Sequence, residues 1–158
     1  MRAARPAPNN KVRPTGLYIA GFLAGWGLHQ LLEFHIDGDG ASTLQKAVGA
    51  AIIGGGVAMT WWGLSTFMRV RTGIMPDRPA RQLVTFGPYR FSRNPMFVGF
   101  TAIYIGLASL LNLAWPLVLL PLVLGLLTLT VIRHEERYMR HEFGEAFVSY
   151  CGRVRRWL

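Results

Sequence analysis

Three long runs without a charged residue constrain the fold of this chain more than any other feature. They extend from Thr15 to Leu32, from Ala47 to Met68 and from Asn94 to Ile132, in a chain of 158 residues. Apolar stretches beyond about 18 residues are typical of membrane-spanning helices, in which every backbone polar group finds its partner inside the helix. The sequence therefore predicts an all-α, polytopic integral membrane protein that forms a single domain over residues 1–158.

The third run is too long for one span. Its 39 residues would make a helix of about 58 Å, whereas the hydrocarbon core of a bilayer is ~30 Å thick. Asn112, Trp115 and Pro116 favour a turn within it, because Asn accepts turn conformations, Trp prefers the interface and Pro suits the first turn of a helix. We expect four transmembrane helices, at about 15–33, 46–68, 95–111 and 114–132. The glycine triplet at 54–56 predicts a close helix–helix contact.

Lysine and arginine are distributed unevenly around these spans. Four lie in the first fourteen residues, six in the segment 69–93 and six in the tail from Arg133 onward. The segment after the first span carries Glu33, Asp37 and Asp39 instead, with only Lys46 at its far end. By the positive-inside rule, both termini and the segment 69–93 are expected in the cytoplasm, and we expect the membrane to be a bacterial inner membrane.

The net charge of +9 raises the question of a nucleic-acid partner. The arginines flank the spans, and no basic helix with interleaved aromatic residues is present, so contact with anionic membrane lipids is the better explanation. Cys151 is the single cysteine, and Tyr138 stands where an HExxH motif beginning at His134 would need its second histidine. We therefore expect no metal site.

The stretch GPYRFSRNPMFVG, at residues 87–99, stands at the entrance to the third span. Gly87-Pro88-Tyr89 is typical of a tight turn that aims an aromatic ring, and Asn94-Pro95 is typical of a helix start. Arg93 lies beside the first free backbone N–H groups of that helix and can bind a carboxylate or a phosphate. Such a corner suits a polar cofactor that meets a lipid-soluble partner at the membrane surface.

The C-terminal stretch RHEERYMRHEFGEAFVSY, at 133–150, carries apolar residues at helical spacing. It predicts one amphipathic helix that continues from the fourth span and lies against the cytoplasmic face of the membrane. Glu135 and Glu136 stand where the span leaves the lipid. Acids at the C-terminal end of a spanning helix oppose the helix dipole, which indicates a task other than solvation.

The block RPARQLVTFGPYRFSRNPMFVG, then an apolar hairpin, then EERYMRHEFGEAFVSYCGRV, resembles the isoprenylcysteine carboxyl methyltransferase family. It is similar also to the phospholipid methyltransferase-like proteins of the same superfamily. The resemblance covers residues 78–158. It implies a membrane enzyme that takes a methyl group from S-adenosyl-L-methionine, with the cofactor entering from the cytosol and the acceptor arriving from the bilayer.

The resemblance assigns cofactor binding to the segment before the turn, the aromatic residue of the turn, the start of the third span and the first acid of the C-terminal helix. These residues are Arg81, Gln82, Leu83, Val84, Tyr89, Asn94, Pro95, Met96, Phe97 and Glu135. Many eukaryotic members have His where this chain has Asn94, and Tyr where it has Phe97. The substrate-side arginine of the family falls on Val131 here, so Arg133 is the nearest arginine for that role.

Methyl transfer from a sulfonium needs alignment and exclusion of water more than covalent help. A carboxylate acceptor needs only Arg93 or Arg133 to position it, whereas an amine must lose a proton to Glu135, Glu136 or His134. The candidate catalytic residues are therefore Arg93, Arg133 and Glu136. We expect an amphiphilic acceptor, first the carboxylate of an isoprenylated thiol compound and otherwise a phospholipid amine. A nicotinamide-dependent reductase and a lipid-binding membrane module are the alternatives outside methyl transfer.

Overall fold

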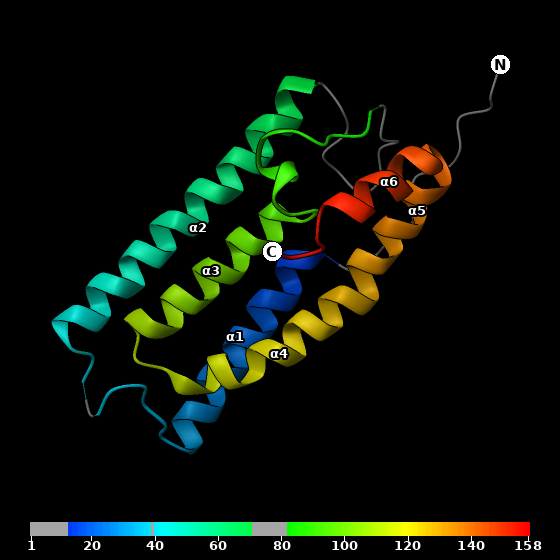
Figure 1. Cartoon of the computed structure of the whole chain (residues 1–158). Helices are drawn as coiled ribbons and strands as arrows, with labels where there is room; N and C mark the ends of the chain where they lie inside the picture. The colour runs from blue at the N-terminus through cyan, green and yellow to red at the C-terminus, as the bar shows by residue number, and fades with distance from the viewer. Residues whose placement is uncertain (1–12, 39, 71–81) are drawn as a thin grey trace.

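The structure is a computed structural model that describes residues 13–38, 40–70 and 82–158. Its elements, in chain order, are α1 (Pro14–Leu31), α2 (Thr43–Val70), the short 3-10 helix η1 (Gly87–Arg90), α3 (Pro95–Leu110), α4 (Ala114–Leu127), the π-helical turn η2 (Thr128–Ile132), α5 (Arg133–Phe143) and α6 (Glu145–Arg153). These described residues form helices and no strand, which confirms the all-α prediction (Figure 1).

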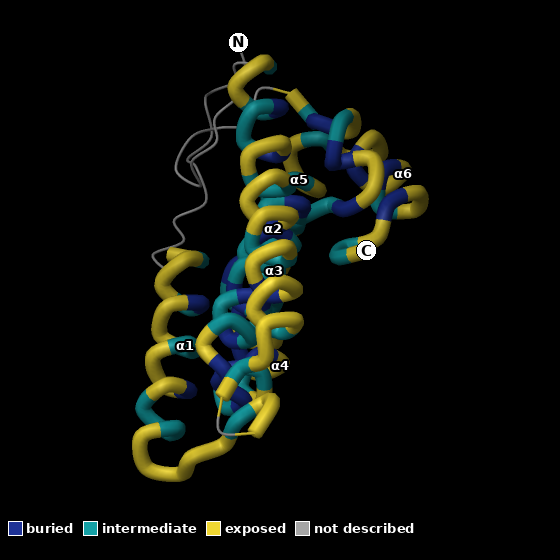
Figure 2. The backbone as a smooth tube through the Cα atoms, turned by 90° about the vertical axis from the view of Figure 1, so that its left-hand side faces the viewer, coloured by how far each residue is buried: buried dark blue, intermediate teal, exposed yellow. Residues whose placement is uncertain are grey.

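Four helices coincide with the four predicted spans to within about three residues at each end, when η2 is counted with α4. Two helices in the described ranges are long and apolar enough to cross a membrane, namely α2 and the continuous helix Ala114–Phe143. α3 is apolar but shorter, at 16 residues. Large apolar side chains on these helices are exposed, among them Trp61, Leu122 and Leu129. Figure 2 shows exposed stretches along the helices of the bundle. Exposed apolar faces of this kind are those that lipid covers.

α2 and α3 pack along each other in opposite directions through pairs of glycines. A Cβ on Gly49 would lie 2.9 Å from the carbonyl oxygen of Gly106, and one on Gly99 would lie 2.6 Å from that of Gly56. The two pairs are seven residues apart on each helix, about two helical turns, so the backbones touch at both levels. Of the predicted triplet, only Gly56 makes this contact. Gly54 and Gly55 have open space where a Cβ would stand, so the expectation of close packing was wrong for them.

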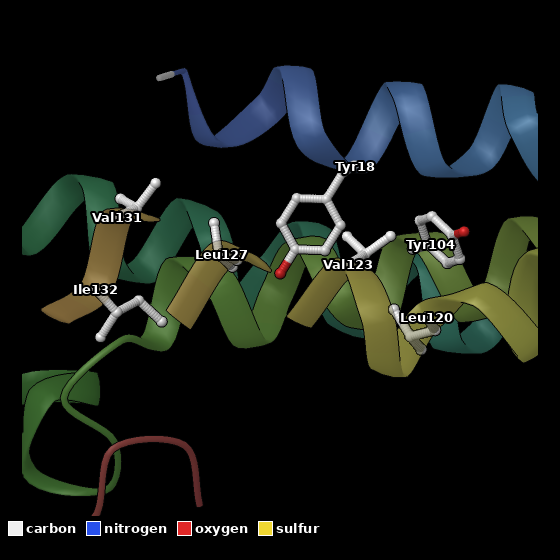
Figure 3. Close-up of a cluster of buried hydrophobic side chains, with 7 residues drawn as sticks. All are labelled: Tyr18, Tyr104, Leu120, Val123, Leu127, Val131 and Ile132. Atoms are coloured by element: carbon white, nitrogen blue, oxygen red, sulfur yellow. The ribbon is translucent and has the colours of Figure 1, made fainter. Parts of the chain in front are cut away.

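α1 packs on α4 by the same means. A Cβ on Gly21 would collide with the side chain of Val123, and a Cβ on Gly25 would lie 2.6 Å from the nitrogen of Pro116. Beside this contact lies the main buried cluster, to which α1, α3, α4 and η2 contribute (Figure 3). Its members are Tyr18, Tyr104, Leu120, Val123, Leu127, Val131 and Ile132. Phe97, at the start of α3, packs against this cluster and so connects it to the site described below.

The turn between α3 and α4 is built on Asn112, as the sequence indicated. Asn112 is the one non-glycine residue of the described chain with a positive φ, 57°, and it is 6% exposed. Its Oδ1 accepts hydrogen bonds from the backbone N–H groups of Ile36 and Asp37 at 3.1 and 3.0 Å. The side chain thereby fastens the loop after α1 to the α3–α4 turn, at the end of the molecule opposite α5 and α6 (Figure 1).

The C-terminal stretch forms two helices, which corrects the prediction of one. α5 continues α4 through η2, but Gly144 adopts φ 54° and ψ −126°, a conformation that a helix cannot continue through and that favours glycine. α6 therefore turns back beside α5 (Figure 1). Phe147 and Tyr150 are buried against Leu83 and the apolar side of α5. The apolar face of α6 thus covers part of the chain itself.

Candidate functional site

The turn at Gly87 carries Tyr89 into the protein. Gly87 has φ +63°, and a Cβ there would lie 3.0 Å from the hydroxyl of Thr66 on α2, so the turn requires glycine for its conformation and for its space. Pro88 then fixes the first turn of η1. Tyr89 is 5% exposed, and its ring stands edge-on to that of Phe67 at 5.0 Å between centroids. The predicted tight turn that aims an aromatic ring is confirmed.

The hydroxyl of Tyr89 is buried and, within the described residues, has no hydrogen-bond partner. It points toward α2, where a Cβ on Gly63 would lie 3.5 Å from it. Burial, and then the charges of Tyr150 and Glu135, raise the pKa of Tyr89 well above its ordinary range. Leaving a buried phenol hydroxyl without a partner is unfavourable, so this group is available to bond a ligand.

The start of α3 is held from outside the helix. Asn94 is the N-cap residue, with φ −129° and ψ 55°, and Pro95 occupies the first helical position, as predicted. The Asn94 side chain makes no capping bond to the helix. Its Nδ2 donates instead to the carbonyl oxygen of Arg156 at 2.9 Å, and its backbone N–H donates to the Ser92 hydroxyl at 3.1 Å. The N–H groups of the first helical turn are thereby left without a side-chain cap.

Arg93 and Glu136, both predicted as catalytic candidates, form an ion pair. Arg93 Nη1 lies 3.0 Å from Glu136 Oε1, and the same nitrogen donates to Cys151 Sγ at 2.7 Å. Arg156 binds the other side of the carboxylate, with Nε 3.0 Å from Oε1 and Nη2 2.7 Å from Oε2. Both oxygens of Glu136 therefore accept hydrogen bonds from guanidinium groups.

Glu135, the neighbour of Glu136, stands in a different environment. Its side chain is half-buried, and burial together with the negative charge of Glu136 raises its pKa from the ordinary value of 4.5 to about 7. Its charge is one of those that act on Tyr89. Two adjacent carboxyl groups thus differ in their surroundings, because two arginines bond Glu136 whereas burial raises the pKa of Glu135.

The remaining predicted site residues are spread around this centre. Val84 and Pro95 are buried, Leu83 packs on α6, and Met96 and Phe97 are half-buried at the start of α3, where Phe97 also borders the main cluster. Gln82 and Arg133 are exposed, and Arg133 begins α5. Arg81 lies outside the described residues. The structure therefore brings Leu83, Tyr89, Arg93, Asn94, Glu135 and Glu136 to one end of the bundle and leaves Gln82 and Arg133 at its surface.

Sequence reasoning missed the contacts that α6 and the tail after it make with the site. Tyr150 donates a hydrogen bond of 2.6 Å to the carbonyl oxygen of Tyr89, and Arg156 contacts both Glu136 and Asn94. Arg156 is one of three arginines in the last six residues, and nothing in their pattern distinguishes it. Only the tertiary fold selects it.

The described residues thus form an apolar helical bundle with a half-buried acid and an unpaired phenol at one end. A family model described as phospholipid methyltransferase matches residues 44–146, well over half of the chain. The chain belongs to the phospholipid methyltransferase family, within the superfamily of membrane methyltransferases that also holds the isoprenylcysteine carboxyl methyltransferases. Comparison with curated proteins and with solved structures gave no match.

Proposed function

We propose that this protein is an integral membrane methyltransferase that uses S-adenosyl-L-methionine to methylate the amine head of a lipid. The observation that carries the choice of acceptor is the state of Glu135, a half-buried carboxyl at the end of an apolar helix whose pKa is raised to about 7. A carboxylate acceptor has no need of a base, whereas an ammonium head must lose a proton before its nitrogen can attack a methyl group. Glu135 is suited to receive that proton.

The residues at this end of the bundle fit the cofactor. S-adenosyl-L-methionine supplies a methyl group on a positively charged sulfur, and it also carries an ammonium, a carboxylate and ribose hydroxyls. The unpaired hydroxyl of Tyr89 can bond a polar group of the cofactor, and the uncapped N–H groups at the start of α3 suit its carboxylate. We assign Tyr89, Asn94, Pro95, Met96 and Phe97, with Arg81, Gln82, Leu83 and Val84, to cofactor binding, and we place Glu135 at the border between the cofactor and the acceptor.

The other candidate bases are less suited to an amine. Glu136 accepts bonds from Arg93 and Arg156 on both oxygens, so taking a proton would break an ion pair. His134 is exposed, and its Nδ1 lies 2.9 Å from Arg137 Nη2. Both would act at a greater free-energy cost than Glu135, which has no such pair to break among the described residues.

A carboxylate acceptor, such as that of an isoprenylated thiol compound, is the second candidate. Arg93 is occupied by Glu136 and Cys151, which disfavours it as the group that orients such an acceptor. The position of Arg133 favours a carboxylate acceptor, because this residue is exposed at the start of α5, where the apolar helix ends. It can meet an anionic head at the membrane surface.

The lipid acceptor requires a particular placement in the membrane. We propose that α1, α2, α3 and the α4–η2 helix all span the bilayer, with both termini, η1, α5 and α6 on the cytoplasmic side. The exposed apolar faces of the helices and the arginines at the α5–α6 end support this orientation. The site then lies at the interface, where a lipid can reach it from the bilayer and a soluble cofactor can reach it from the cytosol.

Calorimetric titration of the purified protein tests the cofactor. We expect S-adenosyl-L-methionine to bind with micromolar to millimolar affinity, the ordinary range of metabolite sites, and a nicotinamide cofactor not to bind. Binding of the nicotinamide alone would indicate a reductase, and binding of neither would indicate a lipid-binding module; each result would overturn the proposal.

Radiolabelled methyl transfer tests the acceptor. The expected product is a labelled amine lipid, formed faster as the pH rises from about 6 to 8, because both the base and the ammonium lose protons over that range. Label in the carboxylate of an isoprenylated thiol, at a rate nearly independent of pH, would select the second candidate. Label only in a water-soluble product would contradict a lipid acceptor.

A further inference from the structure

Three segments distant in sequence meet at the Glu136 carboxylate. Arg93 comes from the residues before α3, Glu136 from α5 and Arg156 from the tail after α6. The side chains of Arg93 and Glu136 are 16% and 18% exposed, and that of Arg156 is 34% exposed. Because the arrangement is largely shielded from water and both guanidinium groups bond the carboxylate, it is stronger than an ordinary surface ion pair.

The backbone of the tail is bonded to the same region. The N–H of Arg93 donates to the carbonyl oxygen of Arg155 at 3.0 Å. The carbonyl oxygen of Arg156 accepts Nδ2 of Asn94 at 2.9 Å and the hydroxyl of Ser92 at 3.4 Å. The tail therefore lies across the residues that lead into α3, and Arg156 contributes to this contact through its backbone and its side chain at once.

The two contacts of Arg156 reach the two sides of the proposed site. Its carbonyl holds the Asn94 side chain away from the first turn of α3, which leaves the N–H groups of that turn uncapped. Its guanidinium holds Glu136, the residue next to Glu135 on α5. Arg156 thus contacts both the N-cap residue of α3 and a residue of α5. The family match ends at residue 146, before the tail.

We propose that Arg156 is a positioning residue, through which the C-terminal tail sets the start of α3 and the Glu135–Glu136 pair of α5 in their working geometry. This inference rests on the proposed function, because the geometry it concerns is that of the cofactor and acceptor site. Arg156 does not touch the reacting atoms. It acts through Asn94 and Glu136.

Arg156 also affects Glu135 through Glu136, whose negative charge raises the pKa of Glu135. The titratable and charged groups of the elements that meet at the Glu135–Glu136 pair are Arg133 and His134 on α5, Tyr89 on η1, Arg93 before α3, Tyr150 and Cys151 on α6, and Arg156 in the tail. With Arg156 present, the negative charge of Glu136 is opposed by two cations. Without it, Glu136 opposes ionisation of Glu135 more strongly, so Glu135 loses its proton at higher pH.

Arg156→Gln tests the proposal, with Arg153→Gln as the matched control. Arg153 carries the same charge three residues earlier, but it is exposed at the end of α6. Two readouts are needed. Calorimetry gives the affinity for S-adenosyl-L-methionine, and infrared titration of the protonated carboxyl, taken as the difference from Glu135→Gln, gives the pKa of Glu135 without any cofactor or turnover.

We expect Arg156→Gln to weaken cofactor binding by about 10-fold and to raise the pKa of Glu135 by about half a unit. Arg153→Gln should change neither. Arg156→Lys should restore the Glu135 titration, because it keeps the charge, while its affinity stays about threefold below that of the unmodified protein, because it cannot make the bidentate contact.

If Arg156→Gln matches Arg153→Gln in both readouts, the positioning role is wrong. If the unmodified protein binds no S-adenosyl-L-methionine, the proposed function fails, and the infrared titration still decides whether Arg156 controls Glu135. Should Arg156→Gln fail to fold in detergent, Arg156→Lys serves in its place. Cofactor affinity equal to that of the unmodified protein in this variant then counts against the proposal.

Discussion

At the scale of single residues, the surroundings of Glu135 and Glu136 separate two chemically identical side chains. Glu136 accepts bonds from Arg93 and Arg156, whereas Glu135 is half-buried beside that negative charge, and its pKa is raised to about 7. Differences of this kind between neighbouring carboxyls are typical of acid–base sites. They also have consequences for stability that can be measured without knowledge of the substrate.

Glu135→Gln should change how stability depends on pH. The folded protein holds a proton on Glu135 up to about pH 7, whereas the unfolded chain releases it near 4.5, so the stability of the unmodified protein falls as pH rises through that window and is constant above it. The variant has no carboxyl at this position, so its stability does not fall in this way as the pH rises. It should be more stable than the unmodified protein above about pH 7, by at most about 3 kcal/mol, and nearly equal to it below about pH 4.5. Thermal unfolding in detergent at a series of pH values measures this, and parallel curves for the two proteins would contradict the raised pKa.

Tyr89→Phe should separate the two roles of that residue. The variant keeps the ring against Phe67 and removes a buried hydroxyl that has no partner among the described residues, so the protein without cofactor should be as stable as before or up to about 1 kcal/mol more stable. Cofactor affinity should fall by about 10-fold, because the hydroxyl is assigned a bond to the cofactor.

Tyr150→Phe is the control for Tyr89→Phe. The Tyr150 hydroxyl donates a bond of 2.6 Å to the carbonyl oxygen of Tyr89, so its removal should destabilise the protein by about 1 kcal/mol. Melting temperatures and calorimetric titration of both variants distinguish the two tyrosines. A Tyr89→Phe variant that melts early and binds the cofactor normally would mean that the hydroxyl is structural.

At the scale of elements, the packing of α2 on α3 rests on glycines at a seven-residue spacing, and the same helices carry the site. Thr66 of α2 contacts the turn at Gly87. Gly63 of α2 lies against Tyr89 of η1 and Met96 at the start of α3. A change in the separation of the two helices would therefore move the turn that places Tyr89. The close backbone contact is thus a condition for the site as well as for the fold.

Gly56→Ala should destabilise the protein, whereas Gly55→Ala should not. A Cβ at position 56 would lie 2.7 Å from the carbonyl oxygen of Gly99 and 2.9 Å from the nitrogen of Ile103, so the helices must separate. We expect a loss of about 1–3 kcal/mol, together with weaker cofactor binding. Position 55 has open space, and alanine favours a helix over glycine. Equal melting temperatures for the two variants would contradict the contact.

At the scale of the whole molecule, the two ends of the bundle differ in composition and in task. The end that carries the loop after α1 and the α3–α4 turn is closed by Asn112, through its bonds to Ile36 and Asp37. The opposite end carries η1, α5, α6 and the tail, with most of the arginines (Figure 1). In the proposed topology only this second end meets the cytosol, as the distribution of the arginines indicates.

Reporter fusions at Gly40 and at Leu158 should report opposite sides of the membrane. Gly40 lies in the segment between α1 and α2, and Leu158 ends the tail beside the proposed site. With both termini in the cytoplasm, the Gly40 fusion should be active only for a reporter that works outside the cytoplasm, and the Leu158 fusion only for a cytoplasmic reporter. The same sidedness at both positions would contradict the four-span topology.

Local chemistry alone determined much of this protein. The lengths of the charge-free runs set the ends of α1 to α4 to within a few residues, because a helix in an apolar phase has to satisfy its own backbone groups. Gly87, Asn94-Pro95 and Asn112 marked the turns around α3, because their allowed backbone conformations are properties of the residues themselves. The cofactor-site residues came from a resemblance in the same local motifs.

Only the tertiary structure decided how the two acids of α5 differ and what the tail does. Arg156 meets Glu136 twenty residues away and Asn94 sixty-two residues away, after Gly144 has turned α6 back on α5. Such pairings depend on where helices cross in space. No periodicity or propensity along the chain encodes which of several arginines arrives there, and burial, which gives Glu135 its raised pKa, exists only once those helices have met.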